Sequence, residues 1–251
     1  MSDTPTPLRP CCSIIFDDDR EEDRGVADGL LAGVGDSEGE DDDEDLRSFY
    51  AGDPGDHDSD REMLNLGFSA SHELTSNWSV EANFRYQKFD WDYTGFYVNG
   101  LGADGDTIDR GGNSTSEDSF TQNLDLRLNG RFDTGAVAHT LVVGLDARRY
   151  GVESETGFRY ADPISYADPS YDGANLSDPW YVSADDLTLE QVGLYAQDEM
   201  SFGNWRGSLA LRHDWTSQTG STYTNFVGSS PVDQEDEATT GRAGISYIFD
   251  N

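Results

Sequence analysis

Apolar and polar residues alternate one by one through seven separate segments of the chain. Residues 78–87 (WSVEANFRYQ) show the pattern clearly: Trp, Val, Ala, Phe and Tyr take every second position, with Ser, Glu, Asn, Arg and Gln between them. Such alternation is typical of β-strands, because successive side chains point to opposite faces of a sheet. The pattern predicts strands over residues 64–71, 78–87, 120–129, 141–147, 191–197, 205–215 and 243–249.

Short and long connections alternate between these strands. The short ones are Thr75-Ser76-Asn77, residues 133–137 and Gly203-Asn204, which have the length and composition of β-hairpin turns. The long ones cover residues 89–118, 151–187 and 216–238 and are rich in Gly, Asp, Ser and Asn. Compact soluble domains rarely carry three such loops, whereas outer-membrane barrels combine short periplasmic turns with long external loops.

Residues 1–48 have a different composition. They contain the acidic run EGEDDDEDL (38–46) and few aromatic residues. Such a segment buries too little apolar surface to offset the entropy of an ordered chain. We therefore expect a disordered acidic segment over 1–48 and one folded domain over 49–251.

Composition and charge exclude several classes of protein. Among 251 residues, 50 are Asp or Glu and 16 are Lys or Arg, which gives a net charge of −34 and argues against a nucleic-acid partner. No apolar run reaches the roughly 18 residues that a membrane helix needs, and the N-terminus lacks the basic and apolar regions of a signal peptide. Cys11 and Cys12 are adjacent, so they provide neither a disulfide framework nor metal-ligand spacing.

The fold class predicted from these observations is all-β: a fragment of an antiparallel transmembrane β-barrel with seven long strands. Trp78 and Trp205 directly follow short turns, where barrels carry interfacial aromatic residues. Two alternatives stay open. One is a soluble acidic β-sandwich acting as a binding module, with or without calcium; the other is a small closed barrel of eight strands, with one strand drawn from residues 1–60. The predicted membrane-interface girdle comprises Trp78, Tyr86, Trp205, Trp215 and Tyr247.

Four segments, taken together, resemble a known family. They are REMLNLGFSASHELTSNWSVEANFRYQ (61–87), HTLVVGLDARRYG (139–151), EQVGLYAQDEMSFGNWRGSLALRHDW (190–215) and GRAGISYIFDN (241–251). In this order they resemble the barrel of TonB-dependent siderophore receptors, most closely the ferrichrome and hydroxamate type. The resemblance covers residues 49–251.

The resemblance implies a plugged barrel of about 22 strands in the cell outer membrane. Such a receptor binds a ferric siderophore on its external side, and its partners are that ligand, the lipid of the outer membrane and the TonB energy-coupling system. The implied activity is transport and not catalysis. We recognise no signal peptide, TonB box or plug sequence here, so we expect an internal piece of a receptor, coupled to TonB through a plug absent from this chain. Because open sheet edges are costly in lipid, we expect the piece alone not to work as a transporter.

Aromatic residues in the long connections are candidates for an external ligand vestibule, since they offer rigid amphipathic contact area. The competing interpretation is that these rings belong to the external girdle or pack the loops on one another. The candidate substrate-binding residues are Trp91, Tyr93, Phe96, Tyr97, Tyr166, Tyr171, Trp180 and Tyr181.

The sequence predicts no metal site, cofactor or catalytic residue. The acidic run at 56–60 lacks the Gly and Glu positions of an EF-hand, and this run and the one at 104–109 are interpreted as solvated loops. The four histidines show no metal-ligand spacing, and no Ser/His/Asp arrangement or phosphate-binding loop is present.

Overall fold

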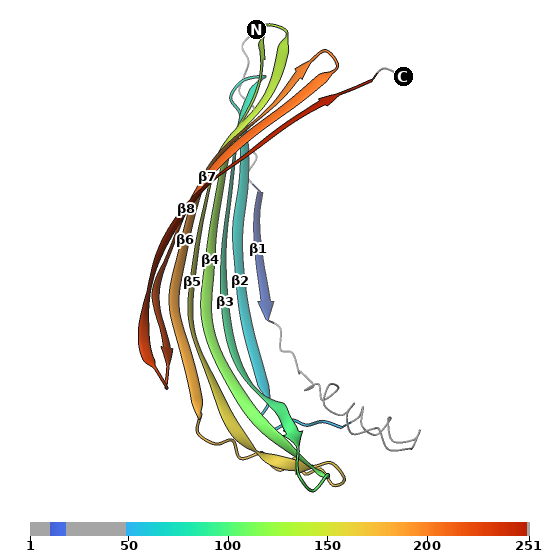
Figure 1. Ribbon diagram of the computed structural model, residues 1–251, viewed down its shortest axis with the longest axis vertical. Coiled ribbons are helices and arrows are strands. Elements are labelled where there is room, and N and C mark those ends of the chain that lie inside the picture. Colours follow the sequence, from blue (N-terminus) through green and yellow to red (C-terminus); the bar gives the residue numbers. More distant parts are fainter. Residues whose placement is uncertain (1–10, 19–48, 250–251) are drawn as a thin grey trace.

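The computed structural model describes residues 11–18 and 49–249, which form one antiparallel sheet of eight strands in chain order. Figure 1 shows a single curved layer with β1 at one edge and β8 near the other. The strands are β1 (Cys11–Asp18), β2 (Asp58–Glu73), β3 (Trp78–Leu101), β4 (Thr107–Thr134), β5 (Val137–Ser165), β6 (Tyr181–Phe202), β7 (Trp205–Thr224) and β8 (Gly228–Tyr247). Within the described residues, no α-helix has the length and hydropathy that crossing a membrane requires.

The single open sheet decides between the predicted architectures. The prediction of seven long antiparallel strands is confirmed by β2–β8. The β-sandwich alternative is wrong, because the described strands form one sheet and not two. The closed eight-stranded barrel is also wrong, because the strand order ends with β1 and β8 at opposite edges.

The short strand β1 corrects the expectation of disorder for residues 1–48. Residues 11–18 pair with β2 in register, from Cys11 opposite Ser69 to Asp18 opposite Glu62. The backbone ladder gives these residues an ordered conformation that their acidic surroundings did not predict. The remaining parts of that segment, 1–10 and 19–48, lie outside the described residues.

The hydrogen-bond register sorts the side chains onto two faces. Directly opposed residues share a face, so Phe84, Leu124, Ala147, Val192 and Trp215 form one row across β3–β7. Leu126, Leu145 and Leu194 form the neighbouring row. We call this side the apolar face. The alternate positions carry Arg85, Asp125, Asp146, Gln191 and Arg212, and we call that side the polar face.

The apolar face is exposed at the middle of the sheet. Leu194 is 46% exposed and Leu211 is 59% exposed, although both belong to the alternating pattern that predicts burial. A soluble sheet would cover such a surface with a second layer. In a barrel wall, the same surface faces lipid while the polar face looks into a wet interior.

The strands extend well beyond the predicted boundaries, so the three long connections were predicted too long. Only 102–106, 166–180 and 225–227 connect strands at that end of the sheet. A membrane needs about 10 residues of a tilted strand, whereas β4 and β5 have 28 and 29. Outside lipid both faces are wet, so Ser, Thr, Gly and Asp continue the backbone ladder without an apolar alternation.

The opposite ends of the strands are joined by the short turns that the sequence predicts. Gly135 and Gly203 lie in two of them, with φ of 67° and 55°. Positive φ is accessible to Gly at little cost and is what tight hairpin turns require. These turns lie together at the top of Figure 1, away from the longer loops.

Replacement of Leu194 by Arg should destabilise the chain in lipid vesicles by about 2–4 kcal/mol, because it places a charge near the middle of the lipid-facing band. Gln197→Arg, on the polar face of the same strand, is the matched control and should change the free energy of unfolding by less than about 1 kcal/mol. Urea titration followed by tryptophan fluorescence measures both. Equal destabilisation by the two variants would contradict the assignment of faces.

Candidate functional site

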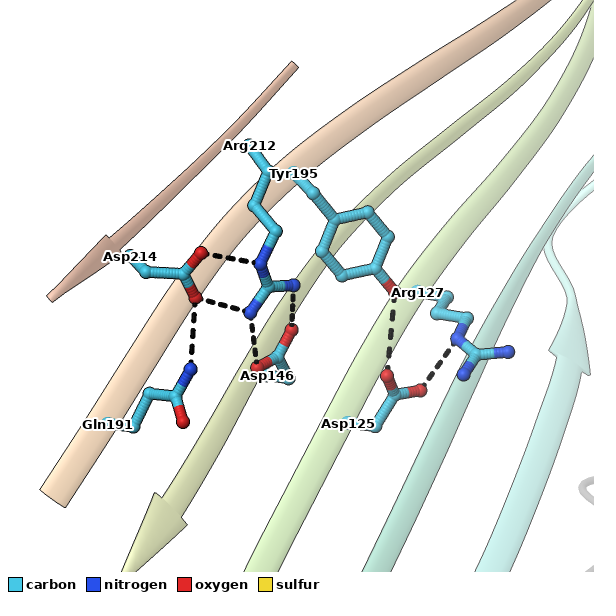
Figure 2. A network of polar contacts seen from close by, with 7 residues as sticks. All are labelled: Asp125, Arg127, Asp146, Gln191, Tyr195, Arg212 and Asp214. Atoms are coloured by element: carbon cyan, nitrogen blue, oxygen red, sulfur yellow. Dashed lines mark hydrogen bonds and ion pairs between the residues drawn. The ribbon is translucent and has the colours of Figure 1, made fainter. Parts of the chain in front are cut away.

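Arg212 lies at the centre of an ion-pair network on the polar face (Figure 2). Its guanidinium donates to both carboxylate oxygens of Asp146, at 2.6 and 2.9 Å, and to both of Asp214, at 2.7 and 2.5 Å. Gln191 also donates to Asp214, at 3.2 Å. Gly193 lies beneath the guanidinium, and a Cβ there would come within 2.1 Å of an Arg212 nitrogen. The network therefore ties β5, β6 and β7 together where only Gly leaves room for the arginine.

A second ion pair continues this arrangement onto β4. Asp125 pairs with Arg127 at 2.7 Å and accepts a hydrogen bond from the Tyr195 hydroxyl at 3.4 Å. Asp125 is directly opposite Asp146 in the ladder, and two like charges in this position are unfavourable unless each is neutralised. Arg127 neutralises Asp125, and Arg212 is shared by Asp146 and Asp214, so every carboxylate of this group contacts an arginine.

Aromatic rings gather on the polar face nearer the long-loop end. Trp91 and Tyr93 are 5.5 Å apart between ring centroids, the Trp91 indole N–H donates to the Ser59 hydroxyl at 3.2 Å, and the Arg61 guanidinium lies 5.1 Å from the Trp91 ring. Further out, Phe158 lies 6.1 Å from Tyr97, 6.3 Å from Trp180 and 5.9 Å from Tyr181. Tyr160 stacks on Trp180 at 6.0 Å.

We call this outer group the aromatic platform: Tyr97, Phe158, Tyr160, Trp180 and Tyr181. The Tyr97 ring lies across Gly111, where a Cβ would meet it at 2.3 Å, so the ring lies close against the sheet. Burial raises the pKa of the Tyr97 hydroxyl, and the nearby Tyr160 raises it further, so Tyr97 stays protonated as a hydrogen-bond donor. Tyr160 is 63% exposed and Trp180 is 43% exposed, which leaves ring surface free for a ligand.

The structure divides the predicted substrate-binding residues into two groups. Trp91 and Tyr93 contact each other on the polar face, and Tyr97, Trp180 and Tyr181 come together around Phe158 further out.

The other three predicted residues lie elsewhere. Phe96 lies on the opposite face, 8% exposed and with Arg110 over its ring, so it is unavailable to a ligand on the polar face. Tyr166 packs on Phe49, and Tyr171 packs on Tyr50 and donates to its carbonyl at 2.9 Å. These two rings hold loops together, as the competing interpretation had it.

Phe158 and Tyr160 are members of the platform that the sequence reasoning missed. They lie in the stretch read as a long loop, so they had no register to place them opposite Asn113 and Gly111 on β4. The signal that points to them is the alternating segment GFRY (157–160), which has aromatic residues two positions apart.

A buried arginine holds the loops beside the platform. Arg110 is 4% exposed and donates to the carbonyls of Ala51, Gly52 and Asp162 at 3.0, 3.1 and 2.8 Å. Burial lowers the pKa of Arg110, and the nearby Asp53 and Asp162 oppose that effect.

Asp53 completes this contact. Its carboxylate is 1% exposed and accepts hydrogen bonds from the Gly55 and Gly173 N–H groups, both at 3.0 Å. We call the Arg110 and Asp53 contacts the outer clasp. The buried apolar side chains of the described residues lie beside it, at the long-loop end: Ala51, Phe96, Ile108, Ile164 and Ala174.

The predicted girdle residues lie at two levels of the apolar face. Trp78 is eight positions from Tyr86 on β3, or about 26 Å of strand. Trp205 and Trp215 on β7 are about 33 Å apart along the strand, which a tilt of about 40° reduces to roughly 25 Å of height, the height of a lipid-facing band. Trp205 contacts Tyr247 at 5.0 Å. The interfacial role of these five residues stays a prediction.

Charged side chains lie on the apolar face just beyond the two levels of the predicted girdle. Beyond Tyr86, Lys88 pairs with Asp90 and Asp118, each at 2.9 Å. Near the short turns, His139 contacts Asp198 at 2.7 Å. Between these levels the apolar face carries no charged side chain on β3–β6, whereas at the β7–β8 edge His213 lies 3.8 Å from Glu237.

Among the described residues, no three His, Cys, Asp or Glu side chains lie close enough together to hold a metal ion. Asp104 in the 102–106 loop accepts hydrogen bonds from the Thr107 hydroxyl and from the Asp106 and Thr107 N–H groups. These bonds, chiefly those from Thr107, lower the pKa of Asp104 and give its carboxylate a structural role.

The fold and its two faces define a class of protein: a wall segment of a membrane β-barrel with a polar interior. The sequence model of the family described as "TonB dependent receptor-like, beta-barrel" matches residues 15–251, so the chain belongs to this family. Its members are receptors and transporters, and the expectation that the chain is not an enzyme is confirmed.

Individual relatives agree with the family. The chain is 29% identical over 208 residues to the ferrioxamine B receptor of Salmonella typhimurium (strain SL1344), covering 81% of this chain and 28% of that protein. It is 25% identical over 211 residues to the ferrichrome outer membrane transporter/phage receptor of Escherichia coli (strain K12), covering 74% and 28%. The chain thus spans less than a third of the length of these relatives.

A solved structure shows the same fold. The siderophore receptor PiuA from Acinetobacter baumannii superposes with a TM-score of 0.64 at 20% identity, covering 79% of this chain and 32% of that one. At this identity the likeness concerns the fold alone.

Replacement of Arg110 by Met should open the outer clasp, because three backbone carbonyls lose a buried charged donor. The loss of about 3 kcal/mol in local stability corresponds to hydrogen exchange at Gly173 and Ala174 that is on the order of a hundredfold faster. Arg149→Met, which removes an exposed arginine 3.4 Å from Glu190, is the control and should leave this exchange unchanged. Unchanged protection in Arg110→Met would show that the clasp does not hold the loop.

Proposed function

We propose that this chain forms part of the wall of an outer-membrane receptor that binds a ferric siderophore and imports it with energy supplied through TonB. The single observation that carries the proposal is the position of the aromatic platform. It lies on the polar face, beyond the lipid-facing band, where a ligand would arrive from outside. TonB coupling would act through other parts of the receptor.

The composition of the platform supports a siderophore as ligand. Tyr97, Tyr160 and Tyr181 combine flat apolar rings with hydroxyl groups, which suits the mixed apolar and oxygen-rich surface of a wrapped iron chelate. The names of the relatives, a ferrioxamine B receptor and a ferrichrome transporter, suggest a hydroxamate chelate in particular.

The apolar face supports a location in the outer membrane. Exposed Leu126, Leu194 and Leu211 lie between the levels marked by Trp78 and Tyr86. A strand-built band of this height is what an outer-membrane barrel presents to lipid.

Trp180→Ala should weaken binding of ferrioxamine B to the chain in lipid vesicles by about tenfold, since it removes a ring that contacts three others. Quenching of intrinsic fluorescence on addition of the ferric complex measures the affinity. Tyr171→Ala is the matched control, because this ring packs on Tyr50 away from the platform, and it should bind as the unaltered chain does. Circular dichroism verifies that both variants keep their strands. An unaltered chain that binds neither ferrioxamine B nor ferrichrome would contradict the proposed function.

A further inference from the structure

One row of the polar face carries uncompensated positive charge. In the ladder, Arg85 is directly opposite Asn123, Asn123 is opposite Arg148, and Arg148 is opposite Gln191. Two arginines on β3 and β5 therefore flank an asparagine on β4, with a glutamine following on β6. The four side chains share one face and one height.

The two arginines differ from their neighbours in having no partner. Arg127 and Arg212 are each held by carboxylates. Arg85 and Arg148 make no side-chain hydrogen bond or ion pair with any residue in the ranges 11–18 and 49–249, and both are exposed. The nearest carboxylates in the next row, Asp125 and Asp146, are already engaged by the other two arginines. Arg85 and Arg148 thus present two guanidinium groups, one on each side of β4, in a chain of net charge −34.

These side chains line a depression in the sheet. Its volume is about 600 Å³, and its lining includes Arg85, Asn123, Arg148 and Gln191 and, in the next row, the carboxylates of Asp125 and Asp146. Because Arg127 and Arg212 hold those two carboxylates, the groups left to contact a ligand are guanidinium and amide groups, which are good hydrogen-bond donors. We call it the arginine groove.

We propose that the arginine groove binds a ligand carrying two carboxylates. Each guanidinium presents a planar fork of N–H groups that matches one carboxylate with two parallel hydrogen bonds. Arg85 and Arg148 are two strand spacings apart, or about 10 Å, so the ligand's two carboxylates lie at about that separation. The amide groups of Asn123 and Gln191 donate to the oxygens left between them.

The groove is separate from the aromatic platform. Arg85 and Tyr97 lie on the same strand and face but about 40 Å apart. A ligand in the groove therefore does not overlap a siderophore bound at the platform. Loss of suberate binding and loss of siderophore binding can be measured independently.

Titration calorimetry with suberate tests the proposal on the whole chain in detergent micelles at low ionic strength. Suberate is a flexible dicarboxylate that can span about 10 Å. It should bind, acetate should bind at least about tenfold more weakly, and added salt should weaken both. Arg85→Gln or Arg148→Gln should reduce suberate affinity at least about tenfold, to the level of acetate.

Arg131→Gln is the matched control. It removes the same charge from the same face of β4, near the short turn and outside the groove. It should leave suberate affinity unchanged. The proposal would be overturned if Arg131→Gln weakened suberate binding as much as Arg85→Gln or Arg148→Gln does. It would also be overturned if the Arg85→Gln and Arg148→Gln double variant bound suberate as tightly as the unaltered chain, or if the unaltered chain did not bind suberate. Strand content by circular dichroism shows that each variant is folded.

The source of the carboxylates can be distinguished in the same assay. The capped peptide Glu-Ala-Glu places two carboxylates on the same side of an extended chain, with their Cα atoms about 7 Å apart, and its flexible side chains can spread the carboxylates to about 10 Å. If it displaces suberate more strongly than free azelate, a dicarboxylate of similar span, the groove is built for acidic side chains of a polypeptide in the barrel interior. If azelate is the stronger competitor, the groove takes a small dicarboxylate. Inorganic phosphate as the strongest competitor would overturn the carboxylate assignment.

Discussion

The backbone hydrogen-bond ladder is the constraint on which this structure depends. In lipid an unpaired N–H or C=O group costs several kcal/mol, so a chain that crosses as strands must pair each strand with its neighbours. The ladder from β2 to β8 does this without interruption at mid-height, and its two irregularities lie near Val98 and Ile108 at the long-loop end. Once the ladder is formed, successive side chains of each strand must point to opposite faces of the sheet. The apolar face then carries Leu126, Leu145 and Leu194, and the polar face carries Asp125, Asp146 and Arg212.

Height along the strands sets what each face carries. Between the levels of Trp78 and Tyr86, the apolar face of β3–β6 carries uncharged side chains, and the polar face pairs its carboxylates with arginines, as Arg212 does with Asp146 and Asp214. Beyond Tyr86 the distinction between the faces fades, with Lys88 and its two aspartates on the formerly apolar side. There the chain builds a buried core around Arg110 on that side, and exposed aromatic rings on the other. The same ladder thus supports an apolar surface and a surface of paired charges on its two faces, and a cluster of exposed aromatic rings nearer the long-loop end.

The predictability of each part follows from the solvent that surrounds it. The strand over 78–87 could be predicted because an apolar and a polar environment on the two faces select alternating residue types. The tight turns at Gly135 and Gly203 could be predicted from their composition. The outer halves of β4 and β5 could not be predicted, because water on both faces removes the alternation. These halves are hydrogen-bonded strands rich in Ser, Thr and Gly. The aromatic platform was found in part, because Tyr97 and Trp180 stood out as aromatic while Phe158 needed the register to join them. The Arg110 contacts join residues 52 to 59 positions apart, which no local pattern reports.

A scan of nitroxide labels along β6, on a chain with Ser at positions 11 and 12, tests the two-faced wall most directly. Single cysteines placed from Leu189 to Gln197 are labelled in lipid vesicles, and collision with oxygen and with a water-soluble nickel chelate is measured by electron paramagnetic resonance. The account predicts a two-residue oscillation with the two reagents out of phase, with oxygen favoured at Val192, Leu194 and Ala196. Accessibility to both reagents that rises and falls together, or does not oscillate at all, would contradict it.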